Sequence, residues 1–91
     1  MIDETVVLNT AKEVFDEMGV DWEPVGVEND KLHGSWILSV HIKSAKKTVK
    51  FYILKALLHK EALLPNQTPL SKLKESMRRH VRYRMEKLES K

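Results

Sequence analysis

SWILSVHIKSAKKTVKFYI, residues 35–53, is the stretch of sequence that decides the fold. Apolar and polar side chains alternate along its first half, which is the period of a β-strand with one buried face. After the polar connection at residues 44–47 the alternation resumes. The pattern predicts an antiparallel β-hairpin that gives the core one set of side chains. This set comprises Trp36, Leu38, Val40, Ile42, Val49, Phe51 and Ile53.

A weaker strand is predicted before this hairpin, at residues 21–27. Pro24 cannot donate to a ladder of hydrogen bonds and Gly26 loosens a strand, so both residues favour the edge of a sheet. Residues 28–31, with the sequence Glu-Asn-Asp-Lys, are predicted to form the turn into the hairpin. The expected sheet therefore has three antiparallel strands, with the weak first strand at an edge.

Helices are predicted on both sides of the strands. The first helix lies between Asp3, which can cap its start, and Gly19, which can end it in a left-handed conformation. The last helix begins where Thr68 offers an N-cap and Pro69 suits the first helical position, and it runs to about Leu88. Between the sheet and this helix, the composition of residues 55–63 favours a short helix, although a continued strand stays open.

These elements predict an α+β fold in which residues 1–91 form one domain. A chain of 91 residues buries a limited core, and a second copy would add burial, so homodimerisation fits the size. The helix-strand-strand-strand-helix order is shared with double-stranded-RNA-binding domains. The basic start of their final helix is not clearly reproduced here, and we do not assign the chain to that family.

Composition and motifs argue against most catalytic and metal sites. The chain has no cysteine, which excludes disulfides, thiolate catalysis and cysteine-based metal sites. The histidines are scattered and lack the spacing of a helical metal site, and no nucleophile with a base or glycine-rich phosphate loop is present. We therefore expect no enzymatic activity, no metal and no cofactor. The four histidines are His33, His41, His59 and His80.

The N-terminus has no signal-peptide pattern, and no run of about 20 apolar residues could cross a bilayer. From these features we expect a cytoplasmic protein.

Charge is divided by position along the chain. Residues 1–31 hold nine carboxylates against two lysines, a net of −7, whereas residues 32–91 carry a net of +10. The total of +3 therefore conceals an acidic third and a basic remainder, which can create a field of one sign on one side of the molecule.

The last helix and the hairpin hold the basic residues with the strongest functional signal. Arginine predominates in the middle of the helix, and its guanidinium matches phosphate in a two-pronged geometry. His80, Arg84 and Lys87 lie nearer the edge of the apolar stripe. The candidate nucleic-acid-binding residues are Lys43, Lys46, Lys47, Lys50, Lys72, Arg78, Arg79 and Arg82.

The first hypothesis is a small non-enzymatic protein that binds nucleic-acid phosphates, with Tyr52 and Tyr83 as candidates for base stacking. It requires that the acidic segment leave the basic groups unneutralised. The alternative is a protein-interaction module, a regulator or inhibitor that docks through charge asymmetry, the edge strand and Trp22, an aromatic residue on that strand. A merely solvated basic helix face is the third reading, and a homodimer is compatible with both hypotheses.

Overall fold

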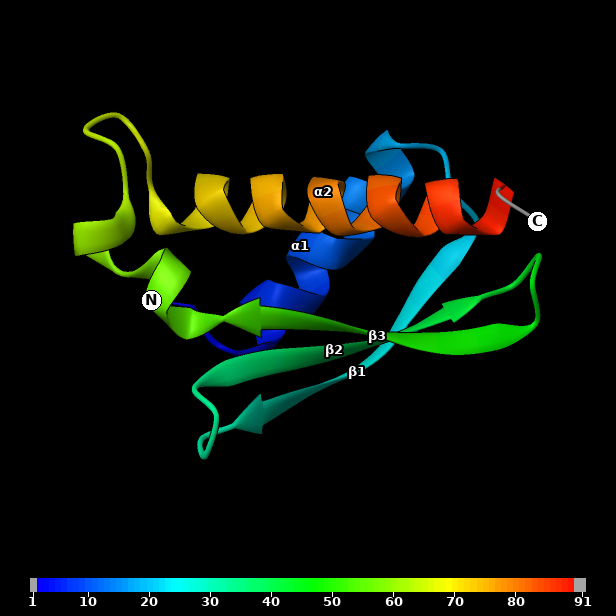
Figure 1. Cartoon of the computed structure of the whole chain (residues 1–91), viewed down its shortest axis with the longest axis horizontal. Helices are drawn as coiled ribbons and strands as arrows, with labels where there is room; N and C mark the ends of the chain where they lie inside the picture. Colours follow the sequence, from blue (N-terminus) through cyan, green and yellow to red (C-terminus); the bar gives the residue numbers. More distant parts are fainter. Residues whose placement is uncertain (1, 90–91) are drawn as a thin grey trace.

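The computed structural model describes residues 2–89, so the first residue and the last two of the predicted domain lie outside it. A three-stranded antiparallel sheet in the order β1-β2-β3 lies beneath two α-helices (Figure 1). This arrangement confirms the α+β class and places the first strand at an edge. The elements are α1 (Glu4–Glu17), β1 (Trp22–Asp30), β2 (Ser35–Ile42), β3 (Lys47–Leu54), η1 (Lys55–Leu58), η2 (Lys60–Ala62) and α2 (Pro69–Glu89).

Helix α1 has the predicted start and end. The Asp3 carboxylate accepts a hydrogen bond of 2.9 Å from the Val6 N–H, which satisfies one of the free donors of the first turn. At the other end Gly19 has a φ of 66°, a left-handed conformation that costs glycine little. The Val20 N–H then bonds the Phe15 carbonyl at 3.1 Å and turns the chain toward β1.

The inner face of the sheet forms the core with the apolar stripes of the two helices. Trp36 pairs with Ile53 and Leu38 with Phe51 across the central hairpin, as the alternation predicts. A bulge at Pro24 to Gly26 interrupts the pairing of β1 with β2. The stripe of α2 enters this core through Leu73, Met77 and Val81, each of them fully buried.

Two local predictions differ from the structure. Strand β1 continues to Asp30, and the turn that we expected at residues 28–31 falls at residues 31–34. Gly34 has a φ of 61° in this turn, and Asp30 accepts hydrogen bonds from the main chain and ring of His33. The ring hydrogen bond from His33 lowers the pKa of Asp30.

The second difference concerns residues 55–63. They form two short 3₁₀ helices, η1 and η2, because His59 between them has extended backbone geometry.

Helix α2 begins at the predicted cap and crosses the molecule above β3. Thr68 and Ser71 bond each other reciprocally, with the Ser71 N–H donating to Thr68 Oγ1 at 3.1 Å and the Thr68 N–H donating to Ser71 Oγ at 3.0 Å. The C-terminal half of α2 lies at the same end of the molecule as the turn between β2 and β3 (Figure 1). Helix α1 contacts both α2 and β1.

Candidate nucleic-acid interface

The turn between β2 and β3 presents three lysines together. Lys43, Lys46 and Lys47 are all exposed, and the Lys46 N–H closes the turn on the Lys43 carbonyl at 3.2 Å. Lys46 has a φ of 51°, the left-handed geometry that the turn requires. Because the turn is tight, the three lysine side chains lie together at one end of the molecule. We call these three residues the hairpin tip.

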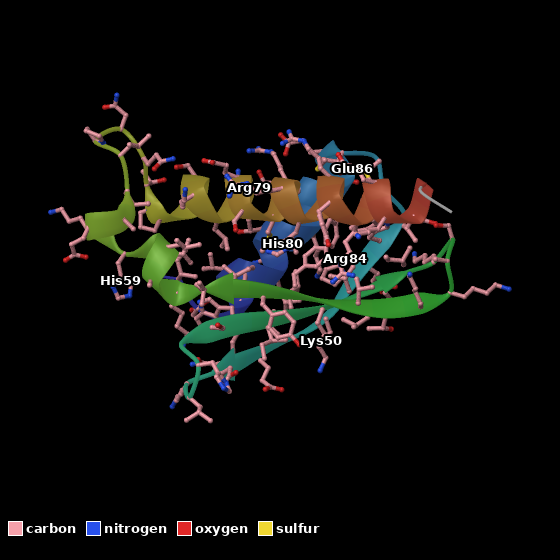
Figure 2. The ribbon with its side chains drawn as sticks, viewed as in Figure 1. Lys50, His59, Arg79, His80, Arg84 and Glu86 are labelled. Atoms are coloured by element: carbon pink, nitrogen blue, oxygen red, sulfur yellow. The ribbon has the colours of Figure 1, made fainter. Side chains whose placement is uncertain are left out.

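Helix α2 is joined to β3 by a hydrogen bond from a side chain to the main chain. The Arg84 Nη2 donates to the Lys50 carbonyl at 3.3 Å. Figure 2 shows His80 and Arg84 on the side of α2 that faces β3, with Lys50 on the strand below them. The acceptor is a neutral carbonyl, so this hydrogen bond does not neutralise the positive charge of the guanidinium. This contact joins the main chain of the basic hairpin to the basic helix, while the Lys50 side chain itself lies on the outer face of the sheet, opposite to the buried Phe51.

His80 fills the space beside this contact. Its imidazole stacks on the Phe51 ring with a centroid distance of 5.0 Å and an interplanar angle of 12°. Burial lowers the pKa of His80, as do the charges of Arg84 and Arg79, against the opposing effect of a hydrogen bond with the Tyr52 main chain. A neutral imidazole at neutral pH follows, so His80 positions the helix rather than supplying charge to the surface.

On its other flank, α2 meets the carboxylates of α1. Lys74 lies 2.7 Å from Glu13, and Arg78 lies 3.2 Å from Glu17. The expectation that the acidic segment leaves the basic residues unneutralised is therefore wrong for Arg78. Packing of α1 beside α2 brings the two acidic side chains over this part of the helix, and Arg78 does not share a free basic surface with the hairpin tip.

The remaining predicted residues of α2 are spread along the helix. Arg79 bonds Glu75 at 3.1 Å, one turn away on the same helix, in an exposed pair. Figure 2 shows Arg79 and Glu86 on the side of α2 away from the sheet. Arg82 is exposed in the C-terminal half. Lys72 lies in the first turn of α2, at the end far from the hairpin tip, so the predicted set is not one continuous patch.

The structure places Trp22 in the core. Its side chain is only 8% exposed, and its ring packs edge-to-face on Phe15 at 5.7 Å and on Phe51 at 6.1 Å. Trp22 is therefore not the exposed aromatic residue that docking of a partner on the edge strand would need. Trp22 is the first residue of β1, an edge strand. Its side chain nevertheless points into the core, because Trp22 pairs with Ile42 on the buried face of the sheet.

Sequence reasoning missed Arg84 as a site residue. Its position at the edge of the apolar stripe was the available signal, because a long basic side chain at such an edge can reach across a neighbouring element. The Nε atom of Arg84 is buried with no hydrogen-bond partner, and the guanidinium reaches the Lys50 carbonyl through Nη2.

No family model, curated protein or solved structure matches the chain. In the described range, no group of three or more histidines and carboxylates could hold a metal ion. Neither helix, over the residues that the structure describes, combines the length and the apolar character needed to cross a bilayer.

Proposed function

We propose that the chain is a small, non-enzymatic, cytoplasmic protein that binds the phosphate backbone of nucleic acid. Its basic surface comprises the hairpin tip together with Lys50, Arg84 and Lys87, whereas Arg82 follows Arg78 by one turn on the other flank of α2. The contact of Arg84 with the Lys50 carbonyl is the observation that carries the proposal, because it unites two basic segments that are far apart in sequence. The paired Lys74 and Arg78 lie on the opposite flank of α2 and are not part of this surface.

Binding at this surface is expected to be largely electrostatic. Lysine and arginine contacts to phosphates release counterions and carry little sequence information. Two exposed tyrosines lie near the basic groups. Tyr52 is on β3, two residues beyond Lys50. On α2, the Lys87 ammonium lies 5.5 Å from the centroid of the Tyr83 ring. Their rings can stack on unpaired bases, which would favour single strands over duplex.

A matched pair of triple variants tests the proposal. Lys46, Lys47 and Lys50 are changed to Gln in one protein, and in the control Lys12, Lys31 and Lys60, which are also exposed, are changed in the same way. Fluorescence anisotropy of a labelled mixed-sequence oligonucleotide at low salt reports the affinity. The first variant should bind at least about 10-fold more weakly and the control within about 3-fold of the unmodified protein, because local phosphate contacts outweigh net charge. Equal losses would refute the proposed location, and no binding by the unmodified protein would refute the function.

The alternative of a protein-interaction module gains no specific support. Trp22 is buried, and the bulge at Pro24 to Gly26 breaks the regular edge of β1, a feature that hinders addition of a further strand. On the other edge, Arg84 of α2 occupies the Lys50 carbonyl of β3. Homodimer formation stays part of the proposal, and sedimentation at low and high salt tests it, since an acidic surface meeting a basic one dissociates with salt.

A further inference from the structure

A cavity of about 850 Å³ opens at the end of the domain opposite the hairpin tip. It lies among the start of α1, the start of α2, η1 and the adjoining ends of β1 and β2. Its volume falls in the range of sites for small organic ligands. Most of its wall is apolar, and the side chains that provide this apolar wall include Val6, Trp36, Leu58 and Leu70.

One ammonium group is fixed in the cavity wall. The Lys55 Nζ donates a hydrogen bond to Asn29 Oδ1 and lies 4.7 Å from the centroid of the Trp36 ring. The main chain is also held, because the Lys55 N–H donates to the Gly34 carbonyl at 2.9 Å. The side chain is half-buried, so the position of the positive charge is set before any ligand arrives.

This ammonium has neutral partners on both sides. An amide oxygen and an indole ring orient the charge without cancelling it, and none of the ion pairs among the described residues includes Lys55. The cavity wall also contains the carboxylate of Asp3. That carboxylate bonds the Val6 N–H at 2.9 Å and faces the positive end of the α1 dipole. A ligand with one negative charge would therefore find its counter-charge at Lys55.

We propose that this cavity binds a small amphipathic carboxylate. The carboxylate accepts a charge-assisted hydrogen bond from Lys55 Nζ, and the apolar chain or ring lies against Trp36 and Leu58. A monoanion fits better than a phosphate ester, because the cavity wall provides one lysine and no arginine fork. The site is separate from the proposed nucleic-acid surface. His59 marks its end of the molecule in Figure 2, far from Arg84 and Lys50.

A ligand series on the unmodified protein tests the proposal. Octanoate, 1-octanol and octylammonium share one chain length and differ in charge. Shifts of the tryptophan indole N–H resonances are followed by NMR, with Trp22, which lies outside the cavity wall, as the internal reference. Octanoate should saturate at millimolar concentration, as expected for a ligand of about ten heavy atoms. Octanoate should shift the Trp36 signal and bind at least about 10-fold more tightly than 1-octanol. Octylammonium should bind the most weakly of the three.

Two variants separate the charge from the cavity. Lys55→Met keeps an unbranched side chain and removes the ammonium, and Lys60→Met is the matched control outside the cavity wall. Lys55→Met should bind octanoate and 1-octanol equally, whereas Lys60→Met should retain the preference for octanoate. The proposal is overturned if octanoate leaves the Trp36 signal of the unmodified protein unchanged, if octanoate and 1-octanol bind that protein equally, or if Lys55→Met keeps the preference.

Discussion

The Arg84 guanidinium closes part of the open edge of the sheet by donating a hydrogen bond of 3.3 Å to the Lys50 carbonyl. β3 is an edge strand, and the carbonyls of an unpaired edge can recruit another strand. The same side chain thus joins the two basic segments and protects the edge of β3.

Replacement of Arg84 by Met should expose this edge. The variant loses a charged donor in a half-buried position, and we expect the free energy of unfolding in urea to fall by about 1 to 2 kcal/mol. Self-association should increase at high protein concentration, because the Lys50 carbonyl becomes available to a second strand. Sedimentation measures this second effect. Unchanged unfolding together with unchanged sedimentation would show that the contact has no structural role.

His80 should make stability depend on pH. Its pKa is lowered in the folded protein, chiefly by burial, so the unfolded chain takes up the proton first. The contribution of His80 to stability is complete above its ordinary pKa of about 6.5 and is lost as the pH falls through the lower pKa of the folded state. Urea unfolding at about pH 7.5 and about pH 5 measures the loss. His80→Phe keeps an aromatic ring against Phe51 and should reduce the difference, and an undiminished difference in this variant would assign it to other groups.

The α1 carboxylates should weaken nucleic-acid binding in the unmodified protein. Changing Glu13 and Glu17 to Gln frees Lys74 and Arg78 from their partners and so adds a second basic flank of α2 to the proposed surface. We expect oligonucleotide affinity at low salt to rise by about 3-fold to 10-fold, with less than about 1 kcal/mol of stability lost per exposed pair. The control Glu28→Gln/Glu61→Gln makes the same change of net charge elsewhere. An equal gain in the control would indicate net charge rather than the local release of Lys74 and Arg78.

Substitution of Trp22 should affect folding rather than partner binding. The indole packs between Phe15 and Phe51 in the core, and its removal leaves a large cavity. We expect Trp22→Ala to lose about 3 to 5 kcal/mol, which is a large share of the stability of a domain this small. Urea unfolding checks this. A fully stable variant would contradict the burial of Trp22 in this core.

Local chemistry was sufficient to predict the main elements of the fold. Asp3 and Gly19 define α1, Thr68 and Pro69 define the start of α2, and the alternation after Ser35 defines the hairpin. The extension of β1 to Asp30 was not predictable in this way. It depends on pairing with β2, which overrides the low strand preference of residues 28–30.

The site was predicted less completely because it depends on packing between elements. The basic residues were visible in the sequence, but the pairing of Arg78 with Glu17 follows from the position of α1 beside α2. The burial of Trp22 likewise depends on Phe15, which reaches the sheet from α1. No sequence pattern singled out Lys55 as a binding residue, because its position beside Asn29 and Trp36 results from the fold.

The dependence of oligonucleotide affinity on salt tests the central claim most directly. The claim is that the hairpin tip, Lys50 and the C-terminal half of α2 neutralise phosphates together. For the unmodified protein, we predict that the logarithm of the association constant falls with the logarithm of salt concentration at a slope of about −3 to −6. The Lys46, Lys47 and Lys50 to Gln variant should reduce the magnitude of this slope by about 2 to 3. A slope near zero, or no binding at the lowest salt concentration, would contradict the account.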